Sequence, residues 1–271
     1  MRLRSVLIFG LGLMVAASVA ACGGGGSEST STSTPAASSA PGGQKVDPAT
    51  AGDVTGSVVF DGTAPKNEPI RMNADPTCLK QATGEQTQET YAVGADGKSL
   101  ANVFVYVKDG LGSYSYDPPT GSVTIDQKGC RYHPHVFGMR TGQKLEILNS
   151  DPTLHNIHAT PKSNSEFNTG QPIQGMTTTH TFSKQEIMVP FKCDVHGWMN
   201  AYVGVVDHPY FAVTDKDGKF ELKTLPPGTY TIEAWHEKMG TQEQKVTIGA
   251  KETKDVAFTF KAPADAAAAS D

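Results

Sequence analysis

This chain has few tryptophans and cysteines, and neither positive nor negative charge is in large excess. Among 271 residues there are 2 tryptophans and 4 cysteines, and 19% of the residues are charged. The 23 basic and 28 acidic residues give a formal net charge of −5 without a basic stripe, so nucleic acid is not an expected partner. Helical periodicity is poor throughout, and glycine and proline interrupt the chain often. The composition therefore favours an all-β fold.

Long apolar runs are missing after the first twenty or so residues, so no later segment is expected to enter a membrane. Residues 1–21 join a basic start to a short apolar stretch that ends in small residues directly before Cys22. This pattern resembles the lipobox of bacterial lipoproteins, which implies a signal peptide over 1–21 and lipid attached to Cys22. The protein would then be extracytoplasmic and anchored to a bacterial membrane on its periplasmic or outer side. An ordinary cleavage site with an incidental cysteine is the alternative.

Two segments, residues 22–50 and 263–271, are not expected to fold. Residues 22–50 are rich in glycine, serine, threonine and proline, which predicts a flexible tether. Residues 263–271 predict a disordered tail. About 225 residues remain, which is enough for two small β domains.

The strongest chemical signal is a group of sulfur and imidazole side chains. Cys193, His196 and Met199 have C-x2-H-x2-M spacing, and His155 lies upstream, just after a predicted strand over 144–148. Two imidazoles, a thiolate and a weak thioether form the ligand set of a blue-copper electron-transfer site. Structural zinc sites favour a closed tetrahedral set with more cysteines or histidines, so copper fits this set better.

Residues 142–149, the pair His155–Asn156 and the Cys…His…Met loop resemble the cupredoxins, the family of plastocyanin and amicyanin. The resemblance implies a Greek-key β-sandwich over 112–209 with one mononuclear type-1 copper ion. Its ligands would be His155, Cys193, His196 and Met199. Asn156 would join the two ligand loops and tune the cysteine sulfur.

The same resemblance assigns a route for electrons. His196, on an exposed ligand loop, would be the electron exit, and Trp198 beside it would help to form the surface on which a redox partner docks. The partner would be a c-type cytochrome or a membrane oxidoreductase. Packing of Trp198 into the core is the alternative reading.

Two cysteines remain once Cys22 is assigned to lipid and Cys193 to copper. Outside the cytoplasm two such cysteines usually pair, which predicts a disulfide between Cys78 and Cys130. Two unpaired buried thiols are the alternative.

The segments that flank the copper domain carry a second pattern. Residues 211–222 predict two strands around an Asp-Gly turn, and residues 225–235 predict a turn and a further strand. These segments resemble the carboxypeptidase-regulatory-like, transthyretin-like β-sandwich, a non-catalytic module. We expect one such sandwich, built from 51–111 and 210–262 and split by the copper domain. A separate strand pair at the N-terminal end and an independent C-terminal sandwich form the rival arrangement.

Together these patterns predict a membrane-tethered carrier of single electrons that works by Cu(II)/Cu(I) cycling and is not an enzyme. A lipoprotein that binds and delivers copper without shuttling electrons is the alternative. A copper oxidase or nitrite reductase would need further histidine pairs, and the stray histidines of this chain do not form them.

Overall fold

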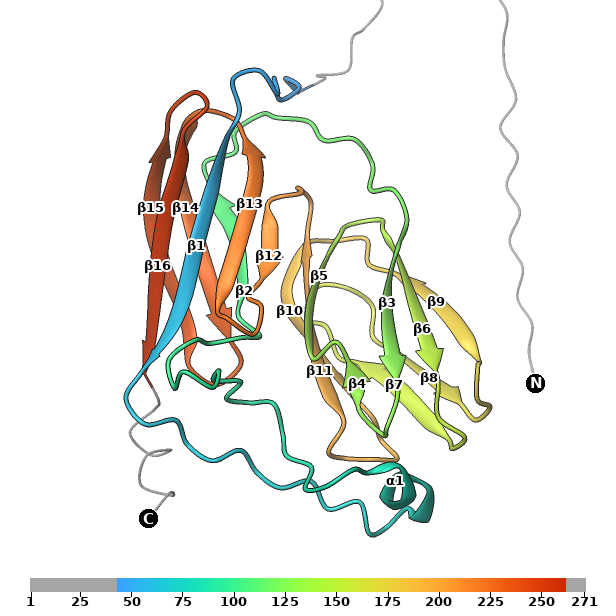
Figure 1. Ribbon diagram of the computed structural model, residues 1–271. Helices are drawn as coiled ribbons and strands as arrows, with labels where there is room; N and C mark the ends of the chain where they lie inside the picture. The colour runs from blue at the N-terminus through green and yellow to red at the C-terminus, as the bar shows by residue number, and fades with distance from the viewer. Residues whose placement is uncertain (1–42, 262–271) are drawn as a thin grey trace, which may run out of the picture. The chain divides into compact units, whose positions relative to one another are not determined.

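The computed structural model describes residues 43–261. The predicted signal peptide, the lipidation site at Cys22 and the predicted tail over 263–271 lie outside the described residues. Between residues 43 and 261 the chain consists of β-strands in four sheets and one short helix (Figure 1), as the sequence predicts for an all-β protein. Within this part of the chain, no helix is long and apolar enough to cross a membrane.

Strands from both ends of the described chain build one sandwich, called here the flanking sandwich. Its first sheet has the order β13-β1-β16 and contains β1 (Gly52–Asp61), β13 (Lys219–Leu225) and β16 (Thr253–Lys261). Its second sheet has the order β12-β2-β14-β15 and contains β2 (Phe104–Asp109), β12 (Phe211–Val213), β14 (Gly228–His236) and β15 (Gly240–Ile248). Strands from before and after the middle of the chain therefore share both sheets of this sandwich.

The core of the flanking sandwich follows from strand periodicity. Buried residues alternate along β1 with half-buried ones, as expected for a strand that turns one face to a core. Val54 and Val58 of β1 share one buried cluster with Ile232 of β14 and Phe258 of β16. Because β1 pairs antiparallel with β13 and parallel with β16, the two halves of the split chain depend on each other.

The remaining strands build the central sandwich. One sheet has the order β5-β11-β10-β7-β8 and contains β5 (Val136–Arg140), β7 (His155–Ala159), β8 (Phe167–Gln171), β10 (Glu186–Lys192) and β11 (Asn200–Val206). The other has the order β4-β3-β6-β9 and contains β3 (Ser122–Gln127), β4 (Tyr132–His133), β6 (Lys144–Asn149) and β9 (Thr177–Thr181). Ile125 and Ile147 from one sheet pack with Phe191 and Val203 from the other.

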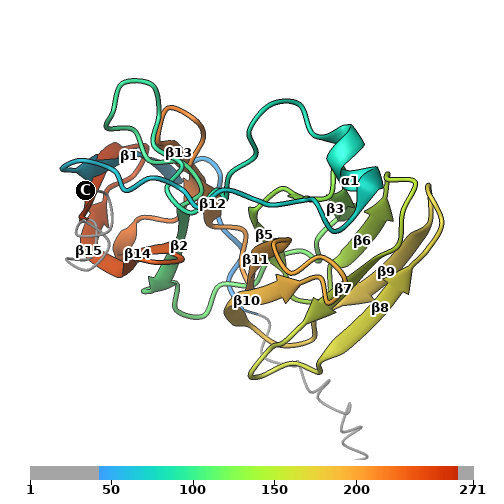
Figure 2. The same ribbon diagram turned by 90° about the horizontal axis from the view of Figure 1, so that it is seen from below.

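The two sandwiches contact each other through β2 and β12 on one side and β5 on the other (Figure 2). Phe104 of β2 and Phe211 of β12 stack with ring centroids 5.9 Å apart. They lie against Gly138 of β5 and Gly204 of β11, which are paired residues on adjacent strands. Two neighbouring glycines thus leave the space that the two rings fill.

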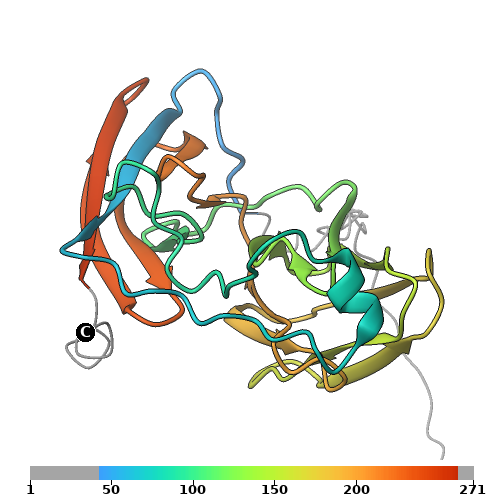
Figure 3. The ribbon, with the colours of Figure 1, turned by 60° about the horizontal axis from the view of Figure 1, so that its bottom comes forward.

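Residues 62–103, which join β1 to β2, are called here the cover segment. It leaves the flanking sandwich and carries the helix α1 (Pro76–Gln81) beside the central sandwich (Figure 3). Met72 and Cys78 of this segment are buried in the same cluster as the core of the central sandwich. The central core therefore includes residues before position 112, the boundary expected from the sequence.

The tether predicted over 22–50 also ends earlier than expected. Gln44 forms a β-bridge with Tyr114, and the Ser115 hydroxyl donates to the Gly43 carbonyl at 2.8 Å. Lys45 Nζ lies 2.5 Å from Asp117 Oδ1. Residues 43–50 therefore belong to the folded unit, because their backbone and charges find partners on it.

Candidate metal centre

Strand order brings the predicted ligands together. His155 is the first residue of β7, Cys193 follows the last residue of β10, and Asn200, just beyond Met199, begins β11. β10 lies between β7 and β11 in one sheet, and Lys192 pairs with both His158 and Asn200. The turn from 193 to 199 and the start of β7 therefore meet at one end of this sheet.

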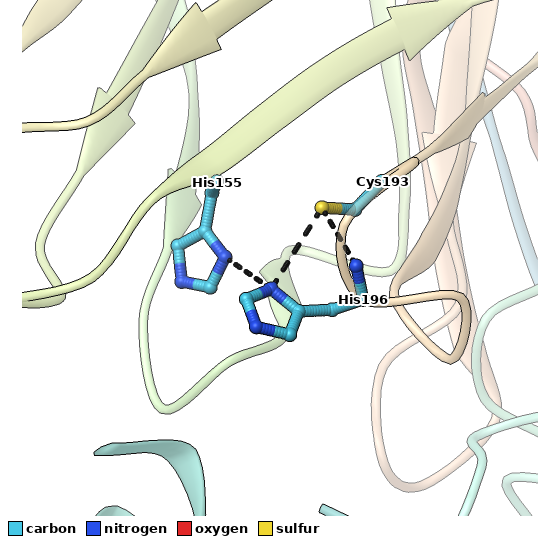
Figure 4. A group of neighbouring side chains, drawn as sticks. All are labelled: His155, Cys193 and His196. Atoms are coloured by element: carbon cyan, nitrogen blue, oxygen red, sulfur yellow. Dashed lines mark hydrogen bonds between the residues drawn. The ribbon is translucent and has the colours of Figure 1, made fainter. Parts of the chain in front are cut away.

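Three of the predicted ligand side chains converge (Figure 4). The Nδ1 atoms of His155 and His196 are 2.9 Å apart, and Cys193 Sγ lies 3.9 Å from His196 Nδ1. One ligand atom from each of the three residues lies within 4.8 Å of the other two. All three side chains are buried, with exposed fractions of 0% for His155 and 2% for each of the others. Two imidazole nitrogens and a sulfur that face one another away from water form a donor set that fits copper.

The outer nitrogen of each imidazole is held by a carboxylate. Asp151 Oδ2 lies 2.9 Å from His155 Nε2, and Asp75 Oδ2 lies 2.9 Å from His196 Nε2. A carboxylate accepts a hydrogen bond from Nε2–H, which keeps the proton there and leaves the Nδ1 lone pair free to bind a metal. The donor atoms therefore point inwards because acceptors occupy the outer side.

These contacts also shift the acidity of the groups. Burial lowers the pKa of His155, but its hydrogen bonds and charge interactions with Asp151 and Cys193 together outweigh burial, and the net pKa is raised. Burial raises the pKa of Asp75, whereas hydrogen bonds from His196 and from backbone amides lower it to about 2. Both carboxylates thus remain charged acceptors at neutral pH, since the pKa of Asp151 is lowered as well.

Cys193 is the one free cysteine in the described part of the chain, and its sulfur has polar partners. The His196 amide donates to Cys193 Sγ at 3.3 Å, and the thiol donates to Asn156 Oδ1 at 3.2 Å. Burial raises the pKa of Cys193, but the hydrogen bond with His155 and those with backbone groups outweigh it, so the pKa is lowered. A lowered pKa favours the thiolate, which is the form that binds metal.

Asn156 and Met199 brace the ligand loop. Asn156 Oδ1 also accepts the Asp194 amide proton at 2.7 Å, so this side chain links β7 to the ligand loop, as the resemblance implies. Met199 is 1% exposed and packs in the same core cluster as Cys193. Its amide donates to the His196 carbonyl at 2.9 Å, and its carbonyl accepts from the Cys193 amide at 3.2 Å. The turn is closed by its own backbone.

The structure corrects the expected position of His196. The loop is exposed at Val195, but the His196 side chain is only 2% exposed, because Asp75 contacts its Nε2 and Cys78 Sγ lies 3.6 Å from the same atom. Trp198 is half-buried, packs against the central core and donates its indole N–H to the Cys130 carbonyl at 3.0 Å. This is the packing alternative for Trp198, and residues of the cover segment bury His196.

The cover segment is pinned in place by a disulfide between Cys78 and Cys130, with sulfurs 1.99 Å apart. The sequence predicts this disulfide but does not identify Asp75 and Asp151 as partners of the ligands. Two weak signals were available: Asp151 precedes His155 by four residues, and Asp75 precedes Cys78 by three. Neither spacing is specific enough to identify a partner of an imidazole.

The family model of the carboxypeptidase regulatory-like domain matches residues 198–261, which begin in the ligand loop and run through β16. A comparison with curated proteins finds no match.

Three solved structures illustrate what about a third of the chain is similar to. A copper-containing nitrite reductase from Thermus scotoductus SA-01 is 20% identical over 36% of this chain and 24% of its own, with a TM-score of 0.31. An amicyanin variant in its Cu(I) form is 18% identical over 33% of this chain and 86% of its own, with a TM-score of 0.28. A purple cupredoxin from Nitrosopumilus maritimus is 20% identical over 31% of this chain and 99% of its own, with a TM-score of 0.27. The chain thus spans about a quarter of the nitrite reductase, and its metal centre is inferred from its own side chains.

Proposed function

We propose that this protein is a blue-copper electron carrier that binds one copper ion at His155, Cys193, His196 and Met199. The observation that carries the proposal is the convergence of His155 Nδ1, His196 Nδ1 and Cys193 Sγ within 4.8 Å in a buried site. A His2Cys set with a weak thioether is the donor set of blue-copper sites. Copper bound there would supply one-electron chemistry.

The protein part of the site suits a carrier because its geometry is fixed without a metal. The strand ends, the Asn156 bridge and the backbone contacts within the turn hold the donor atoms. A site that the protein holds in place rearranges little between Cu(II) and Cu(I), and this favours fast electron transfer.

The cell compartment is part of the same proposal. The disulfide between Cys78 and Cys130 is typical of proteins outside the cytoplasm, where such bonds persist. With lipid on Cys22, the carrier would work at a bacterial membrane, and a c-type cytochrome or a membrane oxidoreductase would be its partner. Mass spectrometry of the chain purified from membranes tests the lipid, and an unmodified N-terminus at another residue would overturn it.

The proposed function is tested with protein that lacks residues 1–41, loaded with Cu(II). We expect an intense visible absorption from thiolate-to-copper charge transfer and narrow copper hyperfine splitting in the electron-spin spectrum. Voltammetry should give a reversible one-electron wave, with the copper still bound after several cycles. Loss of copper on each reduction would favour metal delivery instead, and a colourless protein would reject the site.

Exposed apolar side chains on segments near the proposed copper site would form a docking surface for a redox partner. The described residues include four exposed large hydrophobic side chains, with exposed fractions from 43% to 67%: Leu79, Leu154, Ile173 and Val195. Leu154 precedes His155, Val195 lies between Cys193 and His196, and Leu79 lies beside Cys78 on α1. The loop of Ile173 is bonded to the loop before β7, since Gln174 Nε2 donates to the Ser150 carbonyl at 2.8 Å. Apolar side chains around the site suit a brief, weakly charged contact with a redox protein.

Replacing Leu79 and Leu154 together by serine is expected to slow electron transfer to a c-type cytochrome by about tenfold, the effect of losing about 1.4 kcal/mol of apolar contact. The rate with ferricyanide should change little, because a small oxidant does not need the docking surface. Stopped-flow kinetics of the reduced protein measures both rates. If both rates fall together, the variant has damaged the copper site and not the docking surface.

A further inference from the structure

Asp75 belongs to the cover segment, yet its carboxylate lies against a candidate copper ligand more than a hundred residues away. Its Oδ2 atom accepts from His196 Nε2 at 2.9 Å and from the Thr153 hydroxyl at 3.1 Å. Its Oδ1 atom accepts the amide protons of Thr77 at 2.7 Å and Cys78 at 3.3 Å. The two oxygens therefore have separate tasks: Oδ1 caps α1, and Oδ2 faces the metal centre.

The contact at Oδ2 decides which imidazole nitrogen of His196 carries the proton. A neutral imidazole has one N–H, and a carboxylate can only accept, so the proton is placed on Nε2. The lone pair of Nδ1 then points towards His155 and Cys193. Without this acceptor the proton can lie on Nδ1, and it must leave before a metal binds there.

Asp151 Oδ2 accepts from His155 Nε2 at 2.9 Å and places the proton of His155 on Nε2 in the same way. Asp151, however, lies only four residues before His155. Asp75 reaches His196 only because the cover segment is fixed over the ligand loop. The disulfide to Cys130 fixes Cys78, and Gln88 Nε2 donates to the Trp198 carbonyl at 3.1 Å. Each imidazole thus has its own carboxylate, one local and one supplied from a distant part of the chain.

We propose that Asp75 is a positioning residue of the metal centre, which holds His196 in the tautomer and rotation that offer Nδ1 to the metal. This inference rests on the proposed function and adds the cover segment to the metal centre. Removal of such an outer partner typically lowers metal affinity by 10- to 100-fold.

Two substitutions separate this role from helix capping. Serine and asparagine both cap helices well, so Asp75→Ser and Asp75→Asn should keep α1. Serine is too short to supply a second oxygen to His196. Asparagine offers its amide N–H there when its oxygen caps the helix, which favours the opposite tautomer with the proton on Nδ1. Asp96→Asn is the matched control, because Asp96 Oδ1 accepts the amide protons of Lys98 and Ser99 at 2.9 and 2.8 Å in the same way.

The first measurement uses the metal-free chain and records nitrogen-15 NMR spectra of its imidazoles. We expect a protonated Nε2 at His196 in the unchanged protein and in Asp96→Asn. The proton should shift towards Nδ1 in Asp75→Asn, and both tautomers should be populated in Asp75→Ser. The second measurement is competitive titration with Cu(II) and with Zn(II), in which the two Asp75 variants should bind 10- to 100-fold more weakly.

The outcomes are distinct. If both Asp75 variants keep the original tautomer and bind metals as tightly as Asp96→Asn, Asp75 is a helix cap only and the inference is wrong. A proton on Nδ1 of His196 in the unchanged protein also overturns it. If copper gives no blue absorption but the tautomer still follows Asp75, the proposed function fails and the positioning role stands. Circular dichroism with each variant shows that weak binding does not reflect unfolding.

Discussion

The variant Cys193→Ser is expected to abolish the intense visible absorption of the copper-loaded protein. The absorption requires electron transfer from a thiolate to copper, and a hydroxyl cannot supply it. Soft sulfur also selects copper over other metals. Loss of a hydrogen-bond partner of a ligand weakens metal binding by up to about 100-fold, so loss of the sulfur ligand itself should weaken Cu(II) binding by more than that. Absorption spectra and a competitive Cu(II) titration measure the two effects.

The fold of Cys193→Ser should survive, because serine can make the same hydrogen bonds. Its hydroxyl can accept from the His196 amide and donate to Asn156 Oδ1, as the thiol does. The melting temperature of the metal-free variant should therefore stay near that of the original protein. A variant that keeps its blue colour would reject Cys193 as the copper ligand, since it is the one free cysteine among residues 43–261.

The candidate site is predictable from the sequence where it depends on local spacing. Cys193, His196 and Met199 are close along the chain, and the strands on either side of them are readable from alternation. His155 could be added because it follows a predicted strand. The pairing of β10 with β7 then brings it to Cys193.

The exposure of the site could not be predicted, because it depends on contacts distant in sequence. Asp75 and Cys78 lie in a segment whose only regular element is the short helix α1, and its burial comes from the central core. Short irregular segments carry little periodic signal, so their partners cannot be read from the pattern. For this reason the sequence predicts an exposed His196, whereas the structure buries its side chain.

The split of the flanking sandwich was predictable for a different reason. The Asp-Gly turn at Asp217–Gly218 and the alternation in β1 identify strands that need partners. The segments before and after the central sandwich each offer too few strands to form a stable sandwich alone. The domain boundaries were less accurate, since residues 43–50 and the cover segment lack strand patterns and are placed by tertiary contacts.

Contact between the two sandwiches depends on two small residues that the sequence analysis did not single out. A Cβ atom added to Gly204 would lie 2.3 Å from Phe104 Cζ, and one added to Gly138 would lie 2.4 Å from Phe211 Cδ2. Phe104 is completely buried, so its ring cannot move into solvent. Since Gly138 and Gly204 are paired on β5 and β11, they form one surface without side chains on which both rings pack.

The variant Gly204→Ala is therefore expected to lower the free energy of unfolding by about 1–3 kcal/mol, the usual cost of overpacking a core. Gly170→Ala is the matched control, because Gly170 also lies in a strand of the central sandwich and an added Cβ would meet no atom within 4 Å. The control should be neutral or gain up to about 1 kcal/mol, because alanine loses less backbone entropy than glycine on folding. Urea denaturation of the metal-free proteins measures both values. Equal free energies of unfolding for the two variants would mean that the rings do not pack on the two glycines. A lower value for Gly204→Ala alone would show that the sandwiches stabilise each other through this contact.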